Sequence, residues 1–174
     1  LSDEPLVSVM ISCYNSGKFI KRTLQSVLGQ SYQNLEVIVF DGGSADDTVS
    51  ILENLSQTDP RLKWISEPDD GEYDGFVKAQ KQVSGEIIKW TPADDLWVED
   101  AVAYTIEHFR KNPMTDLIYG NCDLVNEHDE IIGNAERLSP FDRQKLISHR
   151  HGFIPSLTVA YRDYVLREVG YLRS

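Results

Sequence analysis

The sequence predicts an α/β fold around a mostly parallel sheet, with antiparallel additions in the second half. In the first half, short runs rich in valine and isoleucine alternate with segments whose apolar residues recur at helical spacing. Each run stops at a polar loop, which is typical of strands buried on both faces. Beyond Pro113 the apolar runs are shorter and closely spaced, which favours antiparallel pairing.

Each element of the first half has its own signal. The expected strands are Leu6–Ser12, Leu35–Phe40, Leu62–Ile65 and Ile87–Trp90. The helices expected between and after them are marked by Ile20, Leu24, Val27 and Leu28 with Gly29 as a stop, by Val49, Leu52 and Leu55, by the segment Tyr73–Val83, and by Val98, Val102, Ile106 and Phe109. Ser44 and Asp47 resemble a capping box at the second helix.

The second half is expected to hold shorter elements. Strands are predicted at Leu117–Gly120, Leu124–Val125, Ile131–Ile132 and Leu157–Tyr161, and helices at Phe141–Ser148 and Asp163–Val169. The two middle strands read as a hairpin. Because no linker, internal repeat or low-complexity segment interrupts the sequence, we predict a single domain over residues 1–174.

Composition narrows the function. The chain of 174 residues has a formal net charge of −11, which argues against nonspecific binding of nucleic acid. A phosphate ligand stays compatible with this charge, since a metal ion can supply local positive charge. The apolar runs are far shorter than the roughly 20 residues of a membrane-spanning helix. Cys13 and Cys122 are expected to be buried free thiols, and no Cys/His cluster has zinc-ligand spacing.

An acidic pair, Asp94 and Asp95, follows the strand Ile87–Trp90. Two neighbouring carboxylates repel each other, so water or a cation must compensate them if both are to stay ionised. Magnesium takes oxygen ligands and completes its shell with substrate phosphates, which suggests a metal–diphosphate site. The alternative is a solvated acidic turn that caps the next helix, since acidic residues are common at helix N-termini.

Two further polar clusters follow strands of the first half, namely 12–15 and 41–44. Ligands of open parallel sheets bind at the carboxyl ends of the strands, where segments distant in sequence converge. This convergence favours the metal–nucleotide site over the solvated turn.

The ordered set of these motifs resembles the inverting family 2 glycosyltransferases, whose fold is the GT-A type. The matching segments are 7–15, 26–32, 35–48, 71–74, 85–88 and 93–95, which occur in the family's order and approximate spacing. Together they extend over nearly the whole chain. The resemblance implies a three-layer sandwich with a Rossmann-like sheet, in which residues 1–100 bind a nucleotide-sugar and residues 101–174 begin the acceptor-binding half.

The resemblance also implies roles for single residues. Tyr14 matches the position whose ring lies against the base, and Asp41 matches a carboxylate that binds the base or ribose. Asp94 would lie near the ribose, and Asp95 would coordinate Mg2+ or Mn2+, which neutralises the diphosphate. Tyr14 is equally explained as a strand-end residue, and Asp41 as a turn aspartate.

Other positions complete the expected donor site. The backbone at Gly42 would approach the ligand, and Ser12, Asn15 and Asp74 would line the site. Lys78 also matches a polar family position, although a solvated helix lysine is the simpler interpretation.

The chain departs from the family pattern at three places. Val77 replaces a common asparagine, and Ser156-Leu157 stands where a His-Gln pair is usual. His149 and His151 lie nearby and are expected to be ordinary surface histidines. The carboxylate that takes the acceptor's proton is expected beyond Ser174, so we predict a truncated chain.

The sequence therefore predicts metal-dependent transfer of a sugar, with inversion, from a nucleotide-diphosphate-sugar to an acceptor hydroxyl. A UDP-sugar is the favoured donor, and the acceptor is a glycan, lipid or protein. We expect a role in polysaccharide or glycoconjugate biosynthesis in the cytoplasm, with peripheral membrane association at the inner face. The alternative is a donor-binding module without turnover. A sugar nucleotidyltransferase is disfavoured, because residues 14–17 supply no basic glycine-rich loop.

Overall fold

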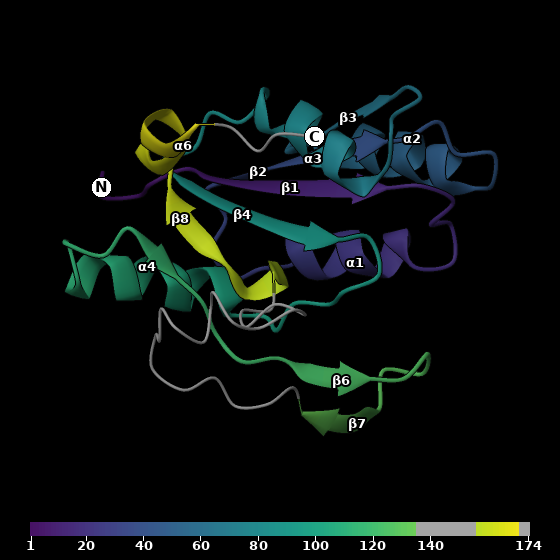
Figure 1. Ribbon diagram of the computed structural model, residues 1–174. Helices are drawn as coiled ribbons and strands as arrows, with labels where there is room; N and C mark the ends of the chain where they lie inside the picture. The colour runs from purple at the N-terminus through teal and green to yellow at the C-terminus, as the bar shows by residue number, and fades with distance from the viewer. Residues whose placement is uncertain (135–155, 171–174) are drawn as a thin grey trace, which may run out of the picture.

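The computed structural model describes residues 1–134 and 156–170. A six-stranded sheet has the order β3-β2-β1-β4-β8-β5 and lies between two layers of helices (Figure 1). The parallel strands are β1 (Val7–Cys13), β2 (Leu35–Asp41), β3 (Leu62–Ser66) and β4 (Ile87–Pro92). The antiparallel additions are β8 (Ala160–Arg162) and β5 (Leu117–Ile118). The predicted fold class is confirmed.

The helices divide between the two faces of the sheet. The bounds are α1 (Ile20–Leu28), α2 (Thr48–Thr58) and α4 (Ala101–Lys111) on one face, and α3 (Glu72–Gln80) and α6 (Tyr164–Val169) on the other. Side chains of β1 point alternately to the two faces of the sheet, so Val9 packs against the layer of α1 and Met10 against the layer of α3. Every residue of β1 and β2 is buried, as expected for central parallel strands.

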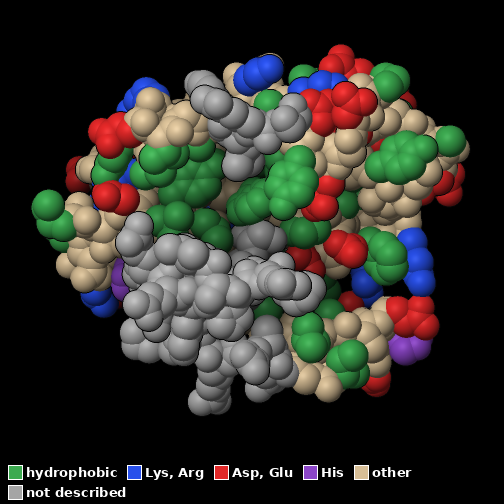
Figure 2. Space-filling view, viewed as in Figure 1, with side chains coloured by type: hydrophobic (Ala, Val, Ile, Leu, Met, Phe, Trp, Pro, Cys, Tyr) green, Lys and Arg blue, Asp and Glu red, His purple; other side chains and the backbone are tan. Residues whose placement is uncertain are grey.

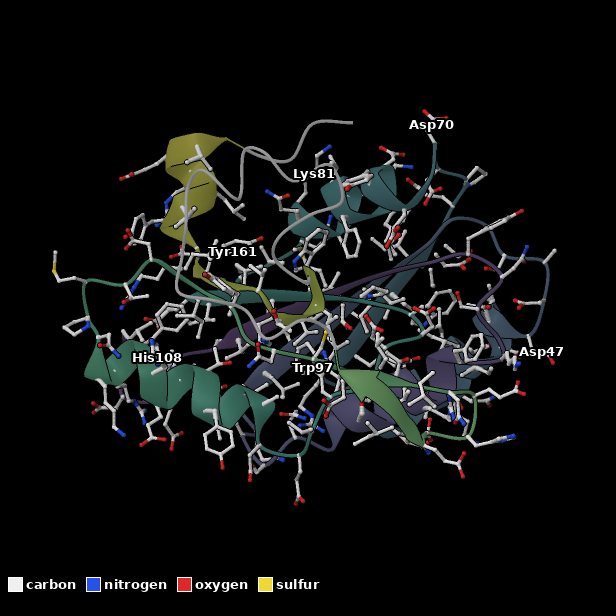
Figure 3. All side chains as sticks on the ribbon, turned by 60° about the horizontal axis from the view of Figure 1, so that its bottom comes forward. Asp47, Asp70, Lys81, Trp97, His108 and Tyr161 are labelled. Atoms are coloured by element: carbon white, nitrogen blue, oxygen red, sulfur yellow. The ribbon has the colours of Figure 1, made fainter. Side chains whose placement is uncertain are left out.

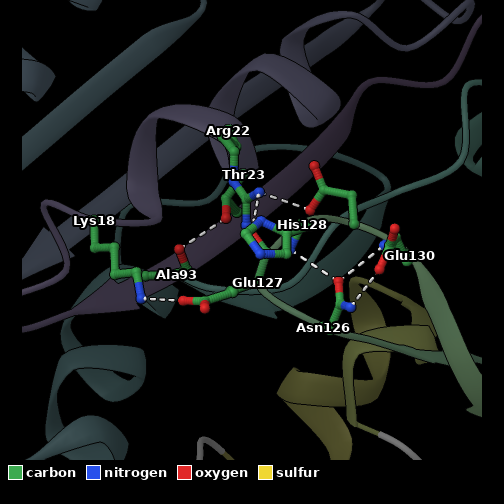
Figure 4. A network of polar contacts seen from close by, with 9 residues as sticks. Lys18, Arg22, Thr23, Ala93, Asn126, Glu127, His128 and Glu130 are labelled. Carbon is green, nitrogen blue, oxygen red and sulfur yellow. Dashed lines mark hydrogen bonds and ion pairs between the residues drawn. The ribbon is translucent and has the colours of Figure 1, made fainter.

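A two-stranded sheet of β6 (Asp123–Val125) and β7 (Ile131–Asn134) stands apart from the main sheet (Figure 1). Its predicted hairpin is confirmed. Two ion pairs tie the hairpin turn to α1 and to the loop just before it: Lys18 Nζ of that loop lies 2.9 Å from Glu127, and Arg22 of α1 lies 2.7 Å from Asp129 (Figure 4). These exposed pairs orient the hairpin beside the first helix more than they stabilise it.

Two predictions of helix ends were wrong. The helix predicted at Tyr73–Val83 ends at Gln80, and Val98 lies before α4 with 72% of its surface exposed. The expected capping box is also absent, because α2 begins after Asp47 and the Ser44 hydroxyl donates to Asp41 instead. Asp41 is buried and needs hydrogen-bond donors, so the Ser44 hydroxyl bonds to it and does not cap the helix.

The second half differs from the prediction in its last strand. The segment predicted as Leu157–Tyr161 starts with a 3-10 turn, Ser156–Thr158, and β8 follows at Ala160–Arg162. The strand predicted at Leu117–Gly120 is shortened to Leu117–Ile118. The helix predicted at Phe141–Ser148, with His149 and His151, lies outside the described residues. No helix in the described part is long and apolar enough to span a membrane.

Candidate functional site

A crevice of about 660 Å³ opens where β1 and β4 end. Each of these neighbouring strands is followed by a helix on the same face of the sheet. Through its helix, β1 connects to β2, which lies on one side of β1, whereas β4 lies on the other side of β1. Such a reversal of strand order is where open α/β sheets bind ligands. Five residues of the predicted donor site line the crevice: Ser12, Tyr14, Asn15, Gly42 and Asp94.

The floor of the crevice depends on a close approach of α3 to β1. A Cβ atom on Gly75 would lie 2.2 Å from the Ser12 hydroxyl oxygen, so only glycine allows this contact. The first turn of α3 therefore reaches the end of β1. It brings Glu72, together with Asp69 from the preceding loop, to the crevice wall.

The loops after β1 and β2 are joined through Asn15. Its backbone N–H donates to the Ser44 hydroxyl at 2.7 Å, and its side-chain oxygen accepts from the backbone of Ala45 at 2.9 Å. Asn15 also adopts a left-handed backbone with φ of 49°, which asparagine tolerates well. Tyr14 is 62% exposed at the rim, so its ring is accessible to a planar ligand.

Asp41 lies behind the crevice wall and does not line it. Its carboxylate accepts from the Ser66 hydroxyl at 2.7 Å, from the backbone of Gly43 and Ser44 at 3.2 and 3.0 Å, and from the Ser44 hydroxyl. Burial alone would raise the pKa of Asp41, but these hydrogen bonds outweigh it and lower the pKa. In this structure Asp41 holds the loop that contains Gly43 and Ser44, and its predicted contact with the donor stays a prediction.

Asp74 and Lys78 form a pair beside the crevice. Their side chains approach to 3.1 Å, and the Lys78 ammonium also donates to the carbonyl of Pro68 at 2.9 Å. Lys78 further lies 4.8 Å from the centroid of the Phe40 ring. The interpretation of Lys78 as a solvated lysine is therefore wrong, because the ammonium fastens α3 to the loop after β3. Asp74 does not line the crevice, and the hydrogen bond from Lys78 lowers its pKa.

The aspartate pair divides between two cavities. Asp94 lines the crevice, whereas Asp95 lines a second cavity of about 890 Å³ between β4, α4 and the segment 117–125. Within the described residues neither carboxylate has a hydrogen bond or ion pair. Burial, together with the negative charges of Asp94 and Glu72, raises the pKa of Asp95 to about 6. The pair is thus a focus of uncompensated negative charge within the described residues. Figure 2 shows several acidic side chains on the face in view.

Helix α1 holds the loop that carries this pair. The Thr23 hydroxyl donates to the carbonyl of Ala93 at 2.7 Å, directly before Asp94 (Figure 4). After the pair, the backbone N–H of Trp97 donates to the Ser26 hydroxyl at 3.1 Å. The buried Gln30 side chain forms hydrogen bonds with the backbone of Val98 and Val102. These contacts fix where both carboxylates point.

The residues present fit a divalent cation that takes most of its ligands from substrate phosphates and water. Within residues 1–134 and 156–170, no group of three or more His, Cys, Asp or Glu side chains could hold a metal. Asp94 and Asp95 both offer carboxylates without a partner among these residues, and of the two Asp95 is the predicted metal ligand. Magnesium is commonly bound by one or two carboxylates together with substrate phosphates and water, so a single protein ligand suffices beside a diphosphate.

Phe19, Asp69 and Glu72 are among the crevice residues that the predicted donor site did not include. Asp69 and Glu72 follow β3, so the rule that ligands gather at strand ends could have found them. Phe19 precedes α1 and carries no such signal, because its place in the crevice depends on how the loop after β1 folds back.

A three-layer sandwich with a crevice at the strand reversal and an acidic pair beside it is the architecture of GT-A glycosyltransferases. The chain belongs to one family within this class, since the model described as glycosyl transferase family 2 matches residues 8–170. The predicted family and fold are confirmed.

The curated relatives of the chain are glycosyltransferases and polysaccharide synthases. It is 38% identical to an uncharacterized glycosyltransferase of Haemophilus influenzae, over 82% of this chain and 45% of that protein. It is 33% identical to chondroitin synthase of Escherichia coli, over 83% of this chain and 21% of that protein. The chain thus spans less than half the length of both.

Solved structures share the fold at lower identity. The mannosyltransferase PcManGT from Pyrobaculum calidifontis, in complex with GDP-Man and Mn2+, has a TM-score of 0.72 and 21% identity, and the match covers 98% of this chain and 48% of that one. S. aureus TarS 1-349, in complex with UDP-GlcNAc, has a TM-score of 0.73 and 22% identity, over 94% of this chain and 47% of that one.

Proposed function

We propose that this chain binds a nucleotide-diphosphate-sugar, with a UDP-sugar favoured, for transfer of the sugar to an acceptor hydroxyl. The observation that carries the proposal is the position of the aspartate pair between two cavities. One carboxylate faces the polar crevice at the strand ends, and the other faces the cavity beside α4. A donor in the crevice and an acceptor in the second cavity would meet at this pair.

The crevice suits a nucleoside diphosphate. The accessible ring of Tyr14 at the rim and the ring of Phe19 inside provide aromatic surfaces for a base. Asp94 accepts hydrogen bonds from ribose hydroxyls, since it lines the crevice without a protein partner. Asp41 supports this site from behind by holding the loop that contains Gly42.

The proposed cation is Mg2+ or Mn2+ on Asp95. When bound, it neutralises charge on the departing diphosphate. The reaction is a displacement with inversion: the acceptor oxygen forms a bond to the anomeric carbon, the bond from that carbon to the diphosphate oxygen breaks, and a base takes the hydroxyl proton. The prediction that the base lies beyond Ser174 stays a prediction.

Calorimetric titration tests the donor site. We expect UDP-GlcNAc to bind with Mn2+ present and to weaken when EDTA removes the metal. Asp95→Asn should lose the metal-dependent part of the affinity, whereas Asp47→Asn, a charge-matched change at an exposed position, should leave it unchanged. A metal-dependent gain that persists in Asp95→Asn would overturn the role of Asp95, and absence of binding by UDP-, GDP- and other nucleotide-sugars would overturn the donor site.

A turnover assay separates the enzyme from a donor-binding module. Donor binding without transfer by residues 1–174 would support a base outside this stretch, and transfer by the same residues would contradict it. We further propose that the acceptor is a growing glycan or a glycoconjugate, because the relatives include chondroitin synthase and a poly-beta-1,6-N-acetyl-D-glucosamine synthase. The reaction is proposed to take place in the cytoplasm, at the inner membrane face.

A further inference from the structure

Lys89 is a charged residue in a place built for an apolar one. It lies in the middle of β4, between Val9 of β1 and Ala160 of β8, and is only 4% exposed. Its neighbours on both strands are fully buried and apolar. Alternation along β4 directs Lys89 to the same face as Ile87, toward α4. Burial of a charge in such a setting is costly unless something compensates it.

The protein itself does not compensate the charge. Within residues 1–134 and 156–170, the Lys89 ammonium has no hydrogen bond and no ion pair. Its contact is with the face of the Trp97 ring, whose centroid lies 4.8 Å away. Burial lowers the pKa of Lys89 to about 8, and no carboxylate offsets this shift. A cation–π contact attracts the ammonium but accepts none of its hydrogen bonds in the manner of an oxygen.

The Lys89 side chain lies at the wall of a cavity. Lys89 and Trp97 both line the cavity of about 890 Å³, together with Asp95 and with Tyr104 and His108 of α4. Figure 3 shows Trp97 near the centre of the molecule, between the helix that carries His108 and the hairpin. The indole N–H of Trp97 is buried without an acceptor in the described structure. Two donor groups thus lack acceptors at one wall of the cavity.

We propose that Lys89 binds an oxyanion, a carboxylate or phosphate, carried by a sugar that occupies this cavity. The inference rests on the proposed function only in taking the occupant to be a sugar. An oxyanion supplies the acceptors that the ammonium lacks, and the low polarity of the wall strengthens the pair. The cavity also contains Asp95, so the anionic sugar belongs either to the acceptor or to the transferred part of the donor.

A pair of matched ligand sets tests this assignment and identifies the source. The acceptor set consists of glucuronate, glucose 6-phosphate and neutral glucose. The donor set consists of UDP-glucuronate and UDP-glucose. Dissociation constants are measured by NMR titration for the weak sugars and by calorimetry for the nucleotides, on the wild-type chain, Lys89→Met and the control Lys81→Met, which changes an exposed lysine.

We expect the wild-type chain and Lys81→Met to bind an anionic ligand of one set about tenfold more tightly than the neutral ligand of the same set. This is the scale of one charge-assisted hydrogen bond. Lys89→Met should lose that preference while its affinity for the neutral member is unchanged. A preference within the sugars assigns the anion to the acceptor, and one within the nucleotides assigns it to the donor. Lys89→Gln provides a second neutral variant if Lys89→Met does not fold.

Two results would overturn the assignment: no preference in either set, or a preference that Lys89→Met and Lys89→Gln retain. Failure of the proposed function gives a different pattern. In that case neither nucleotide binds with any dependence on metal, while the free sugars can still report on Lys89.

Discussion

Two carboxylates at the same edge of the sheet have opposite surroundings. Asp41, at the end of β2, is fully buried and accepts hydrogen bonds from serine hydroxyls and backbone amides. Asp95, three residues after β4, has no hydrogen-bond or ion-pair partner in the described structure. The pKa of Asp41 is lowered, whereas that of Asp95 is raised to about 6.

The difference separates a carboxylate that the fold stabilises from one that the described structure leaves without a partner. Hydrogen bonds to the charged form stabilise Asp41 inside the protein, so the group contributes to the fold. Asp95 has no such donors in the described structure, and in the proposed function a bound cation compensates its charge. A cation that binds Asp95 only in the folded state would stabilise the folded protein.

The largest effect is expected from removing the negative charge of Asp95. Asp95→Asn should weaken Mn2+-dependent binding of UDP-GlcNAc on the order of 100-fold, because the cation loses its charged protein ligand. Calorimetry with and without metal measures this change. The same substitution at Asp41 should leave the metal dependence intact in whatever fraction folds, so equal losses of metal dependence in both variants would contradict the distinction.

The second effect concerns stability at the other carboxylate. Asp41→Asn should lower the free energy of unfolding by about 2–3 kcal/mol, because the amide cannot accept from all the buried donors that now face Asp41. Urea denaturation measures the change. Asp47→Asn, at an exposed position without a side-chain cap, should change stability by less than about 0.5 kcal/mol. An Asp41→Asn variant as stable as this control would show that the loop does not depend on Asp41.

A third effect concerns Lys89, the buried cation on the strand that precedes the acidic pair. The pKa of Lys89 is lowered to about 8, so in the folded state its charge is unfavourable at neutral pH. Lys89→Met should therefore raise the free energy of unfolding at pH 7 by about 1–3 kcal/mol, and the gain should shrink as pH rises through about 8 and the wild-type ammonium loses its proton. Urea denaturation at pH 7 and pH 9.5 tests this, and a gain that is equal at both pH values would contradict it.

The smallest effect is a pH dependence of opposite sign at the two carboxylates. The folded pKa of Asp95 lies above its unfolded value, so the metal-free protein loses stability from this group as pH rises toward 6. Asp41 has a lowered pKa and contributes stability that is lost only in stronger acid. The Mn2+-dependent thermal shift with UDP-GlcNAc should consequently fall as pH drops from 7.5 to 5.5, because protons compete for Asp95.

Thermal shift in the presence and absence of EDTA measures the metal-dependent part directly. The nucleotide-sugar is the right ligand here, because its diphosphate is esterified at both ends and stays ionised over this range. A metal-dependent shift that is constant between pH 7.5 and 5.5 would exclude Asp95 as the titrating ligand.

Much of the fold was predictable because its signals are local. The run of buried residues in β1 and β2 announces central strands, and Gly29 ends α1 as its position predicts. The wrong predictions lie where partners distant in sequence decide the outcome. Ser44 is drawn to Asp41 rather than to the start of α2, and the segment from Leu157 turns before it pairs with β4.

The candidate site was predictable as a place and less so as a set of contacts. Strand ends converge in any parallel sheet, so Ser12, Tyr14, Asn15 and Asp94 could be brought together from sequence order alone. Sequence could not tell that Asp41 turns inward. That outcome depends on donors supplied by β3 and by the loop after β2.

The sequence by itself determined the layers, the parallel core and the edge at which the candidate site lies, because periodicity and turn chemistry act over a few residues. Only the tertiary structure decided which charges are compensated. Asp41 finds its donors, while Asp95 and Lys89 meet a shared cavity without a partner. Compensation of a buried charge depends on atoms from several elements, and their approach is fixed only once the chain is packed.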